Sequence, residues 1–277
     1  MAITAQDVNK LRQMTGSGMM DCKNALVEAE GDFEKAIDIL RKKGLKVAAK
    51  RADRSANEGY VIAKVNADQT YGAVLMLNCE TDFVGKTADF KDIAEEAINI
   101  AIKNQIHSLD DLLSTSLSSG RTVNEALTDM TGKTGEKIEL NHFEHIENAF
   151  VAAYNHNGNR LATIVGFNKT ANGLETVAHE VAMQIAAMNP ISVDEKSIPQ
   201  TVIDRELDIA REQVRQEGKP EAMIDKIAQG KLNKFFKENT LINQEFIRDN
   251  KKTVGQYIKE TDPALVCEGF FRLQLGA

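Results

Sequence analysis

Over the first 44 residues, apolar side chains recur at intervals of three and four, the period of α-helices that pack on one face. Thr4 and Asp7 have the spacing of a capping box at a helix start, and Asp32 is placed to cap a later helix. Gly44 is placed to end that helix. We therefore predict a three-helix unit, close to the lower size limit for independent folding.

After a basic stretch the pattern changes to the alternation of β-strands. Residues 59–66 and 71–79 flank a four-residue turn and predict a hairpin, and a helix with an apolar stripe follows. The same order of hairpin and helix recurs further along, where Asn157-Gly158 is a typical hairpin turn and the following helix stops before Pro190. We therefore predict two related α+β subdomains.

Residues 199–239 are strongly charged and have a helical pattern. Pro220 follows a turn and suits the first position of a second helix, so the stretch predicts an antiparallel helical hairpin that projects from the body. Self-association through this hairpin and packing back on the body are both open. The end of the chain alternates as a closing strand does. One face of that strand would carry Leu265, Cys267, Phe271, Leu273 and Leu275.

These patterns predict an α+β protein made of five parts. The core is predicted to have two subdomains, and the second is interrupted by the helical hairpin. The parts are a three-helix module (1–44), a basic linker (45–57), a first core subdomain (58–140), a second core subdomain (141–198 and 240–277) and the hairpin insertion (199–239).

Composition places the chain among globular proteins, since 27% of its 277 residues are charged and 42% are hydrophobic. No apolar stretch approaches the roughly 20 residues of a membrane-spanning helix, and the start lacks the pattern of a signal peptide. Three widely spaced cysteines favour a reducing compartment over a disulfide framework. We expect a cytoplasmic protein with no membrane contact.

The net charge of −7 argues against a general nucleic-acid-binding function. One segment differs, because residues 41–54 hold seven Lys or Arg residues and a single acid, Asp53. A solvated helix end with a basic linker explains this segment, and a surface for RNA or an acidic partner is the alternative. We expect no direct nucleic-acid binding by the chain as a whole.

Motifs for nucleotide and metal chemistry are incomplete. A phosphate-binding loop needs a glycine five positions before the glycine of its Gly-Lys-Thr, but Glu80 and Leu127 occupy that position before the two Gly-Lys-Thr runs. His179-Glu180 starts a zinc-protease-like motif, but Met183 replaces its second histidine. We therefore predict that the chain is no enzyme and has no cofactor and no metal site.

The stretch after the first hairpin, ETDFV at residues 80–84, places a carboxylate beside a large aromatic ring, Asp82 and Phe83. By residue type, Thr81 and Asp82 can cap a helix start, and Phe83 can pack into the core as a hydrophobic staple. The alternative is a segment that acts on another protein. The residue types alone leave both interpretations open.

Two stretches resemble the elongation factor Ts family, the guanine-nucleotide exchange factors of elongation factor Tu. They are LRQMTGSGMMDCKNALVEAEGDFEKAIDILRKKG at residues 11–44 and NCETDFVGK at residues 78–86. The resemblance runs from residue 3 to the final strand. It implies an N-terminal three-helix module of ubiquitin-associated type, a two-part α+β core and a projecting helical hairpin.

The resemblance also implies a partner, elongation factor Tu in its GDP-bound and nucleotide-free forms. Phe83 offers a rigid apolar wedge, and Asp82 offers a charge that can rearrange hydrogen bonds or repel phosphate. Thr81 is expected to cap the helix as well. The segment implied to enter near the partner's magnesium and nucleotide consists of Thr81, Asp82, Phe83 and Val84.

Two further contacts are implied by the resemblance. His156, in the second hairpin, matches a family histidine that faces the partner's third domain, although the loop here holds an inserted residue. The N-terminal residues implied to dock on the partner's GTPase domain are Met19, Met20, Asp21 and Lys23.

Cys22 and Cys79 are expected to be buried in the core.

An exchange factor binds the nucleotide-free partner better than the nucleotide-bound one, so nucleotide and factor weaken each other's binding. The implied function is to promote GDP release during translation elongation by disturbing the partner's magnesium and phosphate site. The alternative is a ubiquitin-associated-type scaffold without exchange activity. Many relatives continue into a C-terminal helical module, so we expect that contact to be missing here and the affinity to be lower or redistributed.

Overall fold

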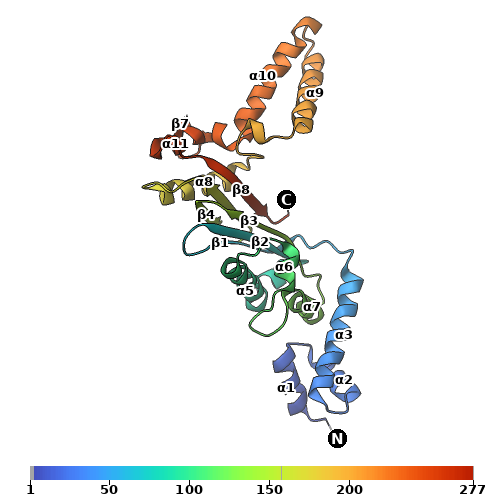
Figure 1. The fold of residues 1–277 in the computed structure, drawn as a ribbon. Helices are drawn as coiled ribbons and strands as arrows, with labels where there is room; N and C mark the ends of the chain where they lie inside the picture. The colour runs from blue at the N-terminus through green and yellow to red at the C-terminus, as the bar shows by residue number, and fades with distance from the viewer. Residues whose placement is uncertain (1–2, 157, 277) are drawn as a thin grey trace.

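The fold is described from a computed structural model, which describes residues 3–156 and 158–276. The chain has the mixed helical and antiparallel-sheet character that was predicted (Figure 1). Two three-stranded sheets lie in the middle of an elongated molecule, with three helices at one end and a helical hairpin at the other. In the described part of the chain, no helix is long and apolar enough to cross a membrane.

The three N-terminal helices meet through their apolar faces. Thr4 and Asp7 form the predicted capping box, each accepting a hydrogen bond from the other's amide, and Asp32 caps the third helix. Leu11 and Leu26 are fully buried in the core between the helices. The helices are α1 (Ala5–Thr15), α2 (Met19–Glu28) and α3 (Phe33–Arg51).

The third helix does not end at Gly44, so that prediction is wrong. α3 continues to Arg51 and makes much of the predicted linker 45–57 helical. Gly44 is buried inside the helix where α3 meets α7 (Val123–Thr134), and a Cβ on Gly132 of α7 would lie 2.8 Å from its Cα. Glycine permits close helix approach here and does not serve a left-handed helix end.

The first sheet has the antiparallel order β1-β2-β3. Its middle strand β2 is buried along its whole length, so both of its edges need a neighbour. The second subdomain was predicted to begin at residue 141, which falls inside β3. Strand pairing corrects this boundary, because β3 pairs with β2. The strands are β1 (Glu58–Val65), β2 (Tyr71–Cys79) and β3 (Glu139–Glu147).

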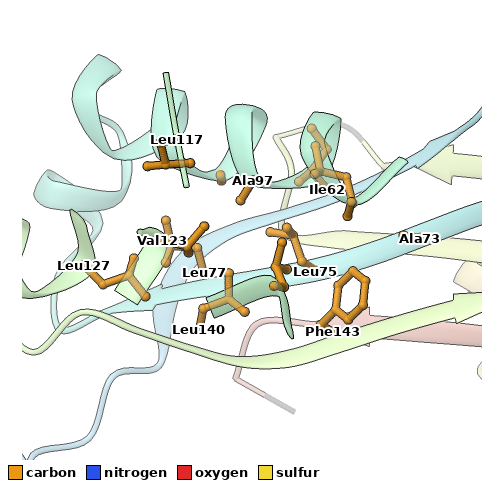
Figure 2. Packing of buried hydrophobic residues seen from close by; sticks show 14 of the residues in the cluster. Ile62, Ala73, Leu75, Leu77, Ala97, Leu117, Val123, Leu127, Leu140 and Phe143 are labelled. Atoms are coloured by element: carbon orange, nitrogen blue, oxygen red, sulfur yellow. The ribbon is translucent and has the colours of Figure 1, made fainter. Parts of the chain in front are cut away.

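Helices cover one face of the first sheet and form the largest core with it. Leu75 and Leu77 of β2 lie in one buried cluster with Ala97 and Val123 from the covering helices, as Figure 2 shows. Burial of such aliphatic side chains is the main stabilising contribution to the fold. The helices after β2 are α4 (Asp82–Gly85), α5 (Ala88–Asn104), α6 (Leu109–Ser114) and α7.

The second sheet has the order β4-β5-β8, and α8 covers one of its faces. α8 stops at Asn189, which adopts the left-handed conformation before Pro190. The other face packs against the first sheet through a cluster that includes Val74 and Ile164. The elements are β4 (Phe150–Asn155), β5 (Leu161–Phe167), α8 (Leu174–Met188) and β8 (Cys267–Gln274).

The closing strand β8 does not keep one apolar face, so that prediction is wrong. Cys267 pairs with Phe167 and Gly269 with Gly166, which leaves residue 268 as an extra residue in a β-bulge. An extra residue reverses the alternation. Cys267 therefore faces the α8 side, whereas Phe271 shares the face toward the first sheet.

The helical hairpin projects from the second sheet, as predicted (Figure 1). Pro220 occupies the cap position just before the second helix, one residue earlier than predicted. Ala210 and Val214 are buried between the two helices. The remaining elements are η1 (Glu195–Ser197), α9 (Gln200–Gln216), α10 (Glu221–Asn239), η2 (Leu241–Asn243), β6 (Glu245–Phe246), β7 (Asp249–Thr253) and α11 (Val254–Thr261).

Candidate functional site

The segment after β2 forms an exposed turn. β2 ends at Cys79, and the chain makes the single helical turn α4 before α5 begins at Ala88. Phe83 is 81% exposed in this turn, so its interpretation as a staple in the core is wrong. The neighbouring Val84 packs against the core of the first sheet. The turn therefore anchors one apolar side chain and displays the other.

The start of the turn is held by the connection between α7 and β3. Thr81 stands at the cap position, but its side chain does not cap the helix. Its amide and hydroxyl both donate to the carboxylate of Glu136, at 3.0 and 2.6 Å. The expected capping role of Thr81 is therefore wrong. Its side chain instead fixes the turn to a neighbouring loop.

Glu80 is fixed from two further directions. Both of its carboxylate oxygens accept 3.0 Å hydrogen bonds from Nη1 of Arg51, and Oε1 also accepts one from the Lys137 amide at 2.7 Å. The Lys137 amide and then Arg51 hold the pKa of Glu80 below its usual value. Sequence reasoning treated Glu80 only as a missing glycine, and so missed this role.

The end of the turn closely approaches the first sheet. A Cβ on Gly85 would lie 3.3 Å from Cys79 Sγ and 3.4 Å from the Gly59 Cα. Cys79 is buried, as predicted, and its thiol donates to the Thr81 carbonyl. Burial, with a contribution from Glu136, raises the pKa of this thiol to about 12. The thiol therefore stays protonated and packs as a core residue.

Asp82 carries a negative charge at the surface of the turn. Lys86 Nζ donates to its carboxylate at 2.5 Å, and this hydrogen bond and the ammonium charge lower the pKa of Asp82. Arg160, from the β4–β5 hairpin, pairs with Glu58 of β1 at 2.5 Å. This hydrogen bond chiefly raises the pKa of Arg160, and the charge of Asp82 adds a smaller contribution. Sequence reasoning missed Arg160, because this arrangement joins segments far apart in the chain.

The N-terminal contact residues form a separate surface. Met19 and Met20, at the start of α2, are 53% and 63% exposed, and Lys23 is exposed as well. Asp21 instead forms an ion pair with Lys43 of α3. α2 lies at the end of the molecule away from the sheets (Figure 1). The structure therefore does not bring these residues together with the α4 turn.

Val27 extends this surface and was missed by sequence reasoning. Its side chain is exposed, and it lies seven residues after Met20 on α2. Residues spaced by about two helical turns share one face, so the spacing could have identified it. Cys22 is fully buried, as predicted.

His156 is exposed at the end of β4, where its Nδ1 lies 2.9 Å from the Tyr154 hydroxyl. The predicted turn that follows includes Asn157, which lies outside the described residues. Beyond it, Val61 of β1 donates to the carbonyl of Asn159 at 2.8 Å. The hairpin end and the α4 turn therefore both lie against β1.

These features define the structural class, an α+β protein that displays a fixed aromatic side chain beside a carboxylate. Among residues 3–156 and 158–276, no three His, Cys, Asp or Glu side chains are grouped as metal ligands.

Comparison with known proteins identifies the family. A model of the family described as Elongation factor TS matches residues 80–277. The proteins named elongation factor Ts of Christiangramia forsetii and Flavobacterium psychrophilum are each 51% identical to the chain, with 99% of both chains covered. That of Porphyromonas gingivalis is 48% identical, with both chains fully covered. The chain belongs to the elongation factor Ts family, which does not favour the alternative of a scaffold.

Proposed function

We propose that the chain is the guanine-nucleotide exchange factor of elongation factor Tu and promotes GDP release during translation elongation. One observation carries this proposal: Phe83 is 81% exposed on a turn that hydrogen bonds to Glu80 and Thr81 fix at its start and that the packing of Val84 on the core fixes after Phe83. An exposed ring buries little apolar surface and therefore contributes little to the chain's own stability. Its fixed display instead serves contact with another molecule.

The proposed mechanism depends on the partner's magnesium ion, which bridges phosphate oxygens and protein ligands and so strengthens GDP binding. Phe83 enters near that site as a wedge and displaces partner side chains. Asp82, ionised beside Lys86, repels phosphate or rearranges the hydrogen bonds around it. Thr81 and Val84 hold the turn in place. No covalent bond changes, so the chain acts as an exchange factor and not as an enzyme in the strict sense.

Thermodynamic linkage limits what the wedge can do. The factor must gain as much binding free energy in the nucleotide-free state as GDP loses in the complex. Each tenfold mutual weakening corresponds to about 1.4 kcal/mol. A rigid platform helps because little of that free energy is spent on ordering the turn after binding.

The other surfaces provide affinity in this proposal. Met19, Met20 and Lys23, on a module of ubiquitin-associated type, dock on the GTPase domain of elongation factor Tu. Asp21 orients that surface through its ion pair with Lys43. His156 faces the partner's third domain. Several contacts along one elongated chain bind more tightly than any contact alone.

Release of fluorescent GDP from elongation factor Tu tests the proposal. The labelled complex is mixed with excess unlabelled GDP and increasing amounts of the chain, and the decay of fluorescence is followed. We expect the release rate to rise with concentration and reach a plateau. Unchanged release at a concentration where sedimentation shows complex formation would refute exchange activity and leave the chain as a scaffold.

A further inference from the structure

One partly buried ion pair joins the three-helix unit to the α4 turn. Arg51 is the last residue of α3, and its Nη1 lies 3.0 Å from both carboxylate oxygens of Glu80. The Arg51 side chain is 33% exposed and that of Glu80 is 15% exposed. A charged group with so little solvent depends on its partner, because water replaces a lost hydrogen bond poorly at such a position.

The position of Glu80 in the chain makes this ion pair important for the turn. Glu80 lies between the end of β2 and the start of α4, three residues before Phe83. Its other hydrogen-bond donor is the amide of Lys137, and the adjacent Thr81 is held by Glu136. Both of these partners lie in the connection after α7, so among the described residues Arg51 supplies the one hydrogen-bonded link from α3 to residues 80–81.

The helices α3 and α7, which lead to these two sets of partners, also contact each other directly. α3 and α7 touch at Gly44 and Gly132, where a Cβ on Gly44 would lie 3.6 Å from the Gly132 Cα. α7 leads into Glu136 and α3 leads into Arg51, so both helices end at the flank of the turn. A helix transmits position because its backbone hydrogen bonds make it stiff along its length.

We propose that Arg51 is a positioning residue for Phe83, through which the orientation of the three-helix unit sets the orientation of the α4 turn. This inference rests on the proposed function, in which Met19 and Met20 dock and Phe83 acts on the nucleotide site. The basic segment around Arg51 then has a role beyond a solvated helix end. Lys50, the neighbouring cation, is exposed and has no ion pair among the described residues.

A tryptophan reporter tests the positioning without elongation factor Tu. The sequence contains no tryptophan, so Phe83→Trp places a single reporter in the turn. We expect Arg51→Met in that background to lower the fluorescence anisotropy of the reporter, because the turn loses its fixed orientation, whereas Lys50→Met, which removes the same charge one residue away, leaves the anisotropy unchanged. Equal anisotropy with and without Arg51 would overturn the inference.

Exchange kinetics test the consequence in chains that keep Phe83. We expect Arg51→Met to lower the maximal rate of GDP release roughly tenfold, equivalent to about 1.4 kcal/mol. The half-saturating concentration should change less than about twofold, since Met19 and Met20 are untouched. Arg51→Lys should restore part of the rate. A raised half-saturating concentration with an unchanged maximal rate would overturn the positioning role.

A second variant keeps the test decisive if Arg51→Met folds poorly. Glu80→Gln preserves side-chain size. If Arg51 acts through Glu80, the double variant of Glu80→Gln and Arg51→Met should release GDP at a maximal rate no lower than that of the slower single variant. If the double variant instead lost the sum of the two single variants' losses in activation free energy, Arg51 would not act through Glu80. If the unaltered chain fails to accelerate GDP release, the proposed function fails, while the reporter measurement still decides whether Arg51 positions the turn.

Discussion

Two connections in this protein each lead from the middle strand of a sheet to a helix, but their side chains differ. Residues 80–87 lead from β2, the middle strand of the first sheet, to α5, and residues 168–173 lead from β5, the middle strand of the second sheet, to α8. The first connection displays Phe83. The second has the sequence NKTANG and contains no large apolar side chain.

Both connections are anchored, so the difference does not come from the needs of the fold. The backbone N–H of Asn168 donates to the Val266 carbonyl at 3.1 Å, and its side-chain Oδ1 accepts from the Val266 amide at 2.9 Å. Lys169 pairs with Asp262. Strand and helix can thus be joined securely without an exposed ring. The ring at Phe83 is an addition to the connection, which is the argument for a function there.

Removal of that ring should produce the largest effect. We expect Phe83→Ala to slow the maximal factor-stimulated release of GDP roughly a hundredfold, about 2.7 kcal/mol, because central aromatic contacts dominate interfaces. The free energy of unfolding should change by less than about 0.5 kcal/mol, since the side chain is exposed. Stopped-flow GDP release and chemical denaturation measure the two quantities.

The second connection provides the matched control for this prediction. Asn172→Ala, at an exposed position before α8, should leave GDP release unchanged. If Phe83→Ala and Asn172→Ala gave equal rates, the α4 turn would not be the acting segment. If Phe83→Ala lowered stability by several kcal/mol, the ring would serve the fold after all.

The two glycines of the connections should respond differently to alanine. A Cβ on Gly85 meets Cys79 Sγ and the Gly59 carbonyl oxygen at 3.3 Å, so Gly85→Ala should cost about 1 to 2 kcal/mol of stability and, by shifting the turn, slow GDP release roughly tenfold. Gly173→Ala meets no atom within 4 Å but places alanine at φ +79°, which should cost about 1 kcal/mol with no change in release. Equal release rates for the two variants would refute a geometric role for Gly85.

Local chemistry explains which parts of the fold could be predicted from the sequence. The capping box at Thr4 and the helix end at Asn189 depend on residues within one or two helical turns, and both were predicted. Hairpins were predicted for the same reason, because alternation and turn residues act between neighbours.

Contacts between distant segments could not be predicted in this way. Gly44 has the residue type of a helix end, but its packing on Gly132, 88 residues later in the chain, decides its role. The pairing of β3 with β2 depends likewise on the path of the chain through α7. Residue types identified Phe83 and Asp82 as candidates, whereas their outward display depends on Glu136 and other distant partners.

His156, at the end of the second hairpin, should contribute to the affinity for elongation factor Tu and not to the maximal rate of GDP release. We expect His156→Ala to raise the half-saturating concentration about threefold, equivalent to about 0.7 kcal/mol, with the maximal rate of GDP release unchanged. His142→Ala, at another exposed histidine in β3, should change neither quantity. A fall in the maximal rate for His156→Ala would assign this hairpin to the same task as the α4 turn.

The smallest effect should come from the lysine in each connection that pairs with a carboxylate, Lys86 with Asp82 and Lys169 with Asp262. Lys86 and Lys169 lower the pKa of Asp82 and Asp262 respectively, chiefly by donating a hydrogen bond. Each lowered pKa means that the pair's stabilising effect is present above the carboxyl's ordinary pKa, near 3.9, and is lost as the pH falls through the lowered value.

Replacement of either lysine by methionine should therefore raise the pKa of its carboxyl toward that ordinary value, which carbon-detected NMR titration measures. At pH 7 both carboxylates remain ionised, so Lys86→Met should change GDP release less than about twofold, and Lys169→Met should not change it. A tenfold loss of release with Lys86→Met alone would show that Lys86 itself contacts the partner, and the asymmetry between the two connections would then extend beyond Asp82 and Phe83.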